Sequence, residues 1–292
     1  MSRAPNGGLA EGCGEGQIKA MRDLPQTIAL PPEPRSYRGA NWLGFYALYL
    51  KEIRRFWKVG GQTVGAPVIT SLLYMMVFAV ATAGARPPVG GIPFVTFMAP
   101  GLVMMTMLNN AFANASSSLL QAKMQGLTQD FLTPPLSPAE LTAGFALGAM
   151  TRGILVGVIT WLCVLPFSHL GLIHLWAVLY FGIAACAVMG CTGVLAALWA
   201  VKFDHLATVT NFVIMPLTFL SGTFYSVERL PPLVRDASRF NPMFYLIDGF
   251  RYGFIGAHDQ NLLIGAPLVG LLSVGLTVLV WRLFSIGYRL KT

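Results

Sequence analysis

The sequence predicts an all-α membrane protein with six transmembrane helices, an N-terminal interfacial amphipathic helix and short outer re-entrant helices before the last span. Two observations predict this class. Of 292 residues, 55% are apolar and 11% are charged, less than half the charged share of an average soluble protein. Uncharged runs of the length that a bilayer crossing needs, about 20 residues, occupy 59–85, 87–122, 153–201, 205–227 and 260–281. This composition excludes soluble enzymes and nucleic-acid-binding proteins.

The N-terminal segment divides into two parts. Residues 1–38 are rich in Gly, Pro and mixed charge and lack periodicity, which predicts a disordered cytoplasmic tail. Within 39–60, apolar residues recur every three or four positions and basic residues fill the other side. This pattern predicts a basic amphipathic helix in the headgroup plane. Its apolar members are Trp42, Phe45, Tyr49, Ile53 and Phe56, and its basic members are Lys51, Arg54, Arg55 and Lys58.

Residues 61–292 are expected to form one transmembrane domain. The predicted spans cover about 64–84, 93–116, 142–166, 173–199, 207–225 and 262–285. The third and fourth share one long uncharged run, which we divide between Pro166 and His174. Nine of the twenty basic residues lie in the first 58 positions. Because cytoplasmic loops are enriched in Lys and Arg, we expect both termini in the cytoplasm.

Two connections between spans are long enough to hold structure of their own. The inner connection, 119–141, begins with a helix-forming stretch that a pair of prolines ends, so it is suited to contact a cytoplasmic partner. In the outer connection, 226–261, Asn241 is placed to cap a helix that begins at Pro242. That helix, Pro242 to Ile255, would be about 21 Å long, which is too short to cross. We therefore expect it to be re-entrant or interfacial.

The sequence carries no signature of catalysis or of nucleotide binding. The phosphate-binding loop, the zinc-protease motif, the nucleophile elbow and the dinucleotide fingerprint are all absent from the 292 residues. The four cysteines include no CxxC pair, so no metal site is expected. We assign no catalytic residue and no cofactor to the chain. Asp248 and Arg251, three residues apart in the outer helix, are expected to form a local ion pair.

Polar residues inside predicted spans indicate surfaces that face protein or water. Thr106, Asn110, Asn114 and Ser117 recur at helical spacing and form one stripe in the second span. Two interpretations stay open, namely hydrogen bonding between packed helices and a translocation surface. Weaker candidates for the same surface are Thr70, Tyr74, Asn211, Thr218 and Ser221.

Arg152 falls about ten residues into the third predicted span. An arginine inside the membrane is a candidate functional residue, because placing its charge in hydrocarbon is costly. The alternative, at equal weight, is that the span boundary is displaced and that Arg152 lies at the interface.

Four segments together resemble the ABC-2 type exporter permeases, in the branch of the nodulation-factor and daunorubicin-type drug-efflux permeases. They are KEIRRFWK, AKMQGLTQDFLTPPLSP, PLTFLSGTFYSVERLPP and NPMFYLIDGFRYGF. The resemblance implies that six spans form half of a membrane domain, that two copies pair, and that a separate ABC ATPase carrying ATP and Mg binds the inner face. It also implies a bacterial inner membrane protein that exports an amphipathic substrate: a lipid, a lipid-linked glycan or a hydrophobic drug.

The resemblance also implies roles for particular residues. The inner connection would couple the permease to the ATPase, and the first, second and fifth spans of two copies would face one another. Where many members carry an acidic residue ahead of a Leu-Leu pair, this chain reads QDFL, and Gly126 stands where a basic residue is common. The expected coupling residues are Lys123, Met124, Gln125, Gln129, Asp130, Phe131 and Leu132.

Three other functional classes are alternatives to an exporter permease. An ion-coupled secondary transporter usually has carboxylates at mid-membrane, and none of the twelve acidic residues lies in a predicted span. A membrane enzyme would need a group of reactive residues at one interface, which the sequence does not offer. A non-transporting membrane scaffold stays open, and dependence of export on a partner's ATP hydrolysis would distinguish it.

Overall fold

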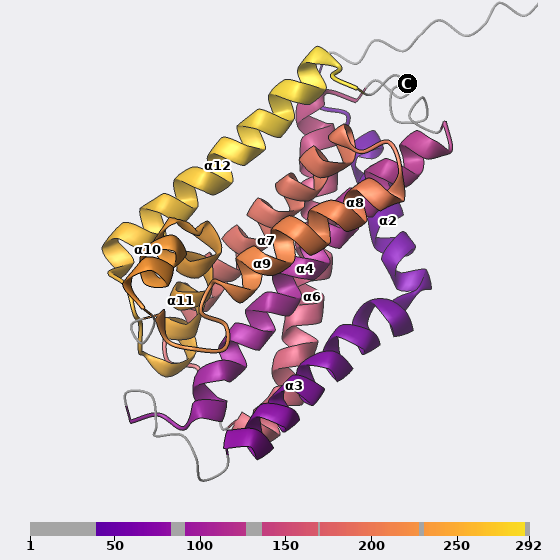
Figure 1. Ribbon diagram of the computed structural model, residues 1–292. Helices are drawn as coiled ribbons and strands as arrows, with labels where there is room; N and C mark the ends of the chain where they lie inside the picture. The colour runs from indigo at the N-terminus through magenta and orange to yellow at the C-terminus, as the bar shows by residue number, and fades with distance from the viewer. Residues whose placement is uncertain (1–38, 83–90, 127–135, 169, 228–230, 290–292) are drawn as a thin grey trace, which may run out of the picture. The chain divides into compact units, whose positions relative to one another are not determined.

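The computed structural model describes residues 39–82, 91–126, 136–168, 170–227 and 231–289 (Figure 1). Within these ranges the protein is built from helices and contains no β-strand, which confirms the predicted all-α class. The predicted tail, 1–38, lies outside the described residues.

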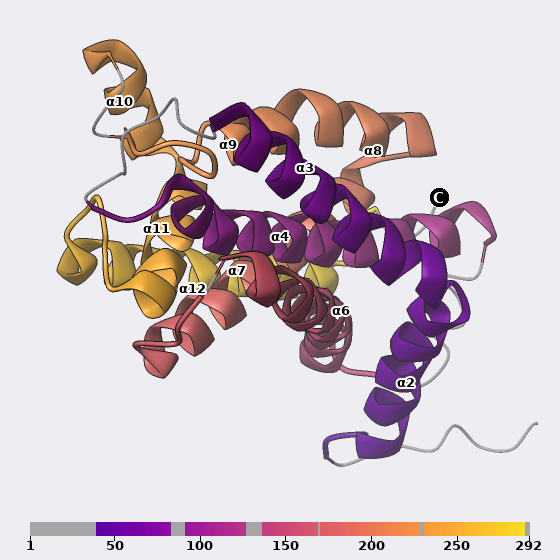
Figure 2. The same ribbon diagram turned by 90° about the horizontal axis from the view of Figure 1, so that it is seen from below.

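The predicted amphipathic helix is α2 (Trp42–Lys58), and Figure 2 shows it running across the direction of α3 and α4. The side chain of Asn41 caps it by accepting from the amide of Gly44 at 3.0 Å. The amide of Asn41 donates to Glu140 of α6 at 2.6 Å, which joins the starts of the two helices. Leu48 and Glu52 are buried against glycines of α6. One face of α2 therefore packs on protein.

Five helices among the described residues are long and apolar enough to cross a membrane. They agree with the first, second, third, fourth and sixth predicted spans. The break between the third and fourth spans begins later than expected, since Pro166 lies inside a helix. The five are η1 (Gly61–Gly65) continued by α3 (Ala66–Thr82), α4 (Phe94–Met124), α6 (Pro138–Ser168), α7 (Leu175–Trp199) and α12 (Leu262–Ile286).

The core of the bundle is α4, which α6 and α7 enclose. Close approach depends on glycine, because a Cβ at Gly153 of α6 would lie 3.1 Å from the carbonyl oxygen of Met107. A Cβ at Gly193 of α7 would lie 2.6 Å from that of Phe112. Small residues at helix contacts allow backbones to approach in this way. In contrast, α3 and α12 are mostly exposed, so their outer faces are available to lipid or to another chain.

The fifth predicted span, 207–225, is a broken helix formed by α8 (Phe203–Val209), η2 (Thr210–Ile214) and α9 (Met215–Phe219). At one end, His205 lies against Trp199, the last residue of α7. At the other, the side chain of Asn241 donates to the carbonyl oxygen of Leu217. The run thus carries the chain from one end of the bundle to the other. Its three parts have 7, 5 and 5 residues, fewer than the ~20 of a full crossing, so a count of six spans stays a prediction.

The predicted helix from Pro242 to Ile255 is confirmed with those bounds as α11, and α10 (Pro232–Phe240) precedes it. The predicted cap is present, since the side chain of Asn241 accepts from the amide of Met243 at 3.0 Å. Helix α11 ends at Gly256, whose φ of 68° is left-handed, a conformation that glycine adopts without strain. It packs on α7, α4 and α12. We call the end of the bundle at which α11 lies the α11 end, and the opposite end, at which α2 lies, the α2 end.

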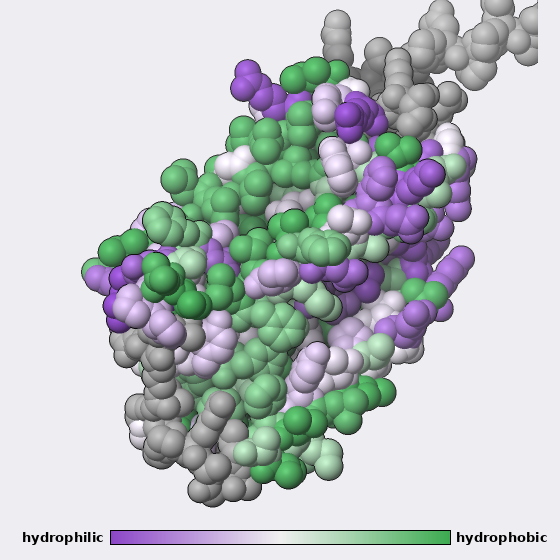
Figure 3. Space-filling view, in the orientation of Figure 1, coloured by the Kyte–Doolittle hydropathy of each residue, from purple (hydrophilic) through white to green (hydrophobic). Residues whose placement is uncertain are grey.

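Hydrophobic side chains cover the middle of the face shown in Figure 3. Hydrophilic residues gather at the α2 end, where α8 begins, and around α10 at the α11 end. A hydrophobic band between two polar ends is the surface expected of a protein that crosses a bilayer.

Candidate functional site

A polar cavity of about 470 Å³ lies among η1, α3, α4, α6 and α9. Hydrophilic residues are visible between α3 and α8–α9 in Figure 3, inside the hydrophobic band. Within the described ranges, no group of three or more His, Cys, Asp or Glu residues is placed to bind a metal ion. The polar members of the cavity lining are Gln62, Thr63, Thr70, Ser71, Tyr74, Thr106, Asn109, Asn110 and Arg152.

The one charged side chain in that lining is Arg152, which lies near the middle of α6. Its Nη2 donates to Oδ1 of Asn110 at 3.0 Å. Helix α6 extends more than a dozen residues on both sides of Arg152, and both the intramembrane and the interfacial interpretation stay predictions. Its functional role stays a hypothesis.

A second polar network joins α2 to α4 at the α2 end of the cavity. The Arg55 guanidinium donates to Oδ1 and to the carbonyl oxygen of Asn114, at 2.9 and 2.7 Å, and to Ser117 at 3.0 Å. Glu52 is fully buried. It pairs with Arg55 at 3.5 Å and accepts from the hydroxyl of Ser118. The positive charge of Arg55 is therefore balanced within the chain.

The predicted stripe on α4 is divided between these two places. Asn114 and Ser117 form hydrogen bonds to α2, as expected for packed helices. Thr106 and Asn110 line the cavity and also bond to α6, Thr106 to Thr160 at 3.5 Å and Asn110 to Arg152 at 3.0 Å. Hydrogen bonds to neighbouring helices therefore occur along the whole stripe, and a translocation role for its cavity residues stays a prediction.

The weaker candidates are also divided. Thr70 and Tyr74 line the cavity. Thr218 and Ser221 are buried at the end of α9, where their hydroxyls donate to the backbone carbonyls of Ile214 and Thr218. Asn211 is exposed on η2.

The expected coupling residues are only partly described. Lys123 is buried, and its Nζ donates to the carbonyl oxygens of Ala197, Leu198 and Ala200 at 2.9 to 3.0 Å. It thereby satisfies unpaired carbonyls at the end of α7. Met124 and Gln125 are exposed after it. The other four, Gln129, Asp130, Phe131 and Leu132, lie outside the described residues, so a coupling role for the segment stays a prediction.

The sequence interpretation missed Glu52 as a site residue. The available signal was its spacing, because Glu52 lies four residues after Leu48 and four before Phe56, on the stripe that the structure buries. An acid on a buried stripe requires partners. Arg55, three positions later on the same helix, is the nearest basic residue that can meet it.

The α11 end contains a different charged pair. The predicted pairing of Asp248 with Arg251 is confirmed at 3.9 Å. Arg251 is 1% exposed, donates to the carbonyl oxygen of Gly222 at 2.6 Å and stacks over the ring of Phe97. Asp248 accepts from the amides of residues 259 and 260. The pKa of the Asp248 carboxyl is raised above its usual value, because the effect of burial outweighs the lowering by the Arg251 guanidinium.

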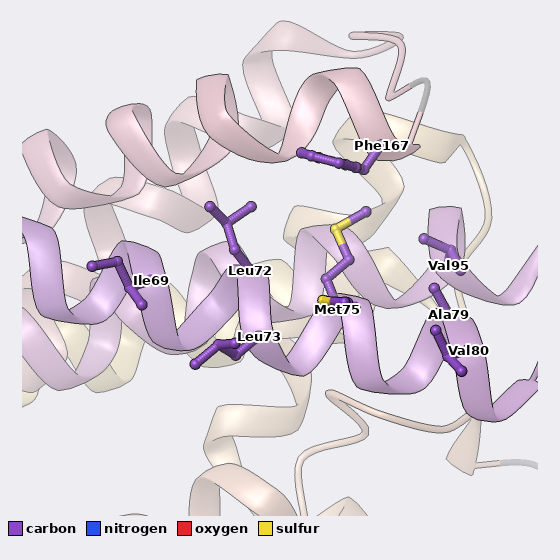
Figure 4. A pocket seen from close by; sticks show the side chains of 9 residues that line it. Ile69, Leu72, Leu73, Met75, Ala79, Val80, Val95 and Phe167 are labelled. Carbon is purple, nitrogen blue, oxygen red and sulfur yellow. The ribbon is translucent and has the colours of Figure 1, made fainter.

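An apolar pocket of about 420 Å³ lies along another face of α3 (Figure 4). In Figure 4, Met75 points from α3 toward Phe167 of α6. Ile69, Leu73 and Phe167 are each more than half exposed, so the pocket opens outward from the bundle. Helix α3 therefore separates a polar cavity from an apolar one.

Residues 44–255 match the family described as "ABC-2 type transporter". The chain is 33% identical over 255 residues to "Inner membrane transport permease YadH" of Escherichia coli (strain K12), a match that covers 86% of this chain and 98% of that protein. It is 22% identical over 229 residues to "Nodulation protein J" of Rhizobium leguminosarum bv. viciae, with 77% of this chain and 86% of the relative covered. The protein of the same name from Neorhizobium galegae is 24% identical over 234 residues, with the same two coverages.

Proposed function

The chain belongs to the ABC-2 type transporter family as a membrane permease subunit, and we propose that it exports an amphipathic substrate in an ATP-driven complex. In this proposal a separate ABC ATPase binds the α2 end from the cytoplasm and supplies ATP and Mg. Two copies of the chain form the membrane domain in the bacterial inner membrane. The substrate is a lipid, a lipid-linked glycan or a hydrophobic drug taken from the cytoplasm or the inner leaflet.

The observation that carries the proposal is the family match over residues 44–255, which includes most of α2, the bundle without α12, and α11. The name of the Escherichia coli relative, a transport permease of the inner membrane, supports the location. The cavity beside Thr70, Asn110 and Arg152 supports a polar path within an otherwise apolar bundle.

Exposed polar residues on the membrane-facing helices support pairing of two copies. Thr70 lines the cavity on α3, and Asn211 is exposed on η2; polar groups facing hydrocarbon are costly. A second copy that covers α3 and η2 would shield both from lipid. The π-helical turns of η1 and η2 lie on these same two segments, and such turns are frequent at functional sites.

Transport in this scheme requires two conformations whose relative stability the ATPase changes. ATP binding elsewhere shifts the balance only if the ATPase contacts the two states differently. The segment 121–132 begins in the last turn of the core helix α4 (Phe94–Met124), so a force applied to that turn reaches the cavity through one helix.

Reconstitution with a candidate ATPase tests the proposal. The permease should copurify with a nucleotide-binding protein, and proteoliposomes containing both should move lipid or drug only while ATP is hydrolysed. Substitution of the phosphate-loop lysine of that ATPase should stop export and leave the complex intact. Export that persists with the inactive ATPase and follows an ion gradient would contradict the proposal in favour of a secondary transporter, and binding without any export would favour a scaffold.

A further inference from the structure

Among the described residues, no carboxylate forms an ion pair with Arg152. It is bonded to the neutral amide of Asn110, whereas two other arginines that contact the bundle each have a carboxylate, the partly exposed Arg55 with Glu52 and the buried Arg251 with Asp248. Their Nε atoms, like that of Arg152, find no acceptor among the described residues. The missing carboxylate, and not a missing hydrogen bond, therefore distinguishes Arg152.

Among the described residues, the carboxylates nearest to Arg152 along the bundle are already engaged by other groups. Glu140 is the only acidic residue in the five crossing helices, and it lies in the first turn of α6, where it accepts from the amides of Asn41 and Ser137. Glu52 is already engaged by Arg55 and Ser118. A second copy would bring the same residues at the same depths. An unbalanced arginine in low dielectric is costly unless an anion or water reaches it.

The cavity has enough space for such an anion beside Arg152. About 470 Å³ of space adjoins Arg152, with Thr70, Tyr74, Asn109 and Asn110 around it as hydrogen-bonding groups. A guanidinium with hydroxyl and amide neighbours is suited to phosphate or carboxylate oxygens.

The apolar pocket on the other side of α3 suits the hydrocarbon part of an amphipathic molecule. Its lining is aliphatic and aromatic, and it opens toward the surroundings of the bundle. Thr70 and Tyr74 face the polar cavity, while Ile69 and Leu73 face the apolar pocket. A molecule that lay against α3 would meet polar groups on one face and apolar groups on the next.

We propose that the polar cavity binds the anionic headgroup, a phosphate or a carboxylate, of the amphipathic substrate, with Arg152 as its counter-ion and the apolar pocket along α3 receiving its hydrocarbon part. The inference rests on the proposed function, because it names the substrate class of that transporter. It also predicts that zwitterionic and neutral amphiphiles bind more weakly than anionic ones of the same chain length.

Lipid-induced thermal stabilisation of the purified permease in an uncharged detergent tests this site without any ATPase. Dioleoyl phosphatidylglycerol should bind the wild-type chain more tightly than dioleoyl phosphatidylcholine. Arg152→Gln should weaken phosphatidylglycerol binding by about tenfold or more and leave phosphatidylcholine unchanged. Arg282→Gln, which removes an exposed arginine of α12, is the matched control and should bind both lipids as the wild type does. Soluble glycerol phosphate should stabilise little, because it lacks the hydrocarbon part.

Asn110→Asp provides a second variant that preserves a partner for Arg152. The new carboxylate would balance the guanidinium from inside, so the lipid-free melting temperature should rise while phosphatidylglycerol binding falls. Unchanged preference for phosphatidylglycerol in both Arg152→Gln and Asn110→Asp would overturn the inference. Equal stabilisation by glycerol phosphate would overturn its amphipathic part. Because the permease is tested alone, neither result depends on whether export is driven by ATP.

Discussion

Two arginines of this protein, Arg251 at the α11 end and Arg152 beside the cavity, are held in opposite ways. Arg251 is enclosed by a carboxylate, a carbonyl oxygen and an aromatic ring. Arg152 is partly exposed and has one neutral amide as its partner. A buried charge that the chain balances fully has a structural role, whereas one left unbalanced beside a cavity is available to a ligand. The partners of a charge, more than its depth, distinguish the two roles.

The largest effect is expected from removing the partner of Arg251. Asp248→Ala leaves a buried guanidinium without its carboxylate, so we expect the permease to lose about 3–5 kcal/mol of stability. Thermal unfolding in detergent measures this loss. Asp236→Ala is the matched control, because Asp236 forms an exposed pair with Arg239, and such pairs contribute little. If both variants melted alike, the α11-end pair would have no structural role.

A smaller effect is expected where α2 joins the bundle. Glu52→Gln removes the charge that balances Arg55 and weakens the bond from Ser118, which should cost about 2 kcal/mol. Arg55 is a quarter exposed, so its guanidinium is able to turn toward water, and the loss should be smaller than at Asp248. Proteolysis at the α2 end, compared with the wild type, measures loosening of α2. An unchanged digestion pattern and melting temperature would show that α2 is held by its apolar residues alone.

Substitutions in the coupling segment, 121–132, should weaken binding of the ATPase without destabilising the permease. Phe131→Ala is expected to weaken ATPase binding by about 2 kcal/mol because it removes an aromatic side chain from the proposed coupling segment, 121–132. Asp130→Ala should weaken it as well, while the melting temperature of the isolated permease stays at the wild-type value. Leu233→Ala, on the exposed surface of α10, is the control for nonspecific effects. Full binding and full export in Phe131→Ala would exclude this segment as the coupling element.

The sequence predicted the helices well because each one depends on local information. Runs without charge located the five long helices, and the pairing of Asn241 with Pro242 located the start of α11. The spacing of Asp248 and Arg251 predicted their ion pair. Each of these features lies within one continuous stretch of the chain, so it can be predicted without a structure.

The site was less predictable because it depends on contacts between distant segments. The sequence placed Asn110 and Asn114 on one stripe, but only the fold directs the first to Arg152 and the second to Arg55. Lys123 was predicted to face a partner, yet its ammonium lies on the carbonyls at the end of α7. Neither pairing leaves a periodic trace in the sequence, so neither could be inferred from spacing.

The contrast between the two arginines is tested most directly by comparing Arg152→Gln with Arg251→Gln in the permease–ATPase complex. For each variant the melting temperature is measured together with stimulation of ATP hydrolysis by phosphatidylglycerol. We predict that Arg251→Gln lowers the melting temperature markedly, whereas Arg152→Gln leaves it unchanged or slightly raised and abolishes the stimulation. An Arg152→Gln complex that melts as early as Arg251→Gln and is still stimulated by phosphatidylglycerol would contradict the assignment of Arg152 to the substrate.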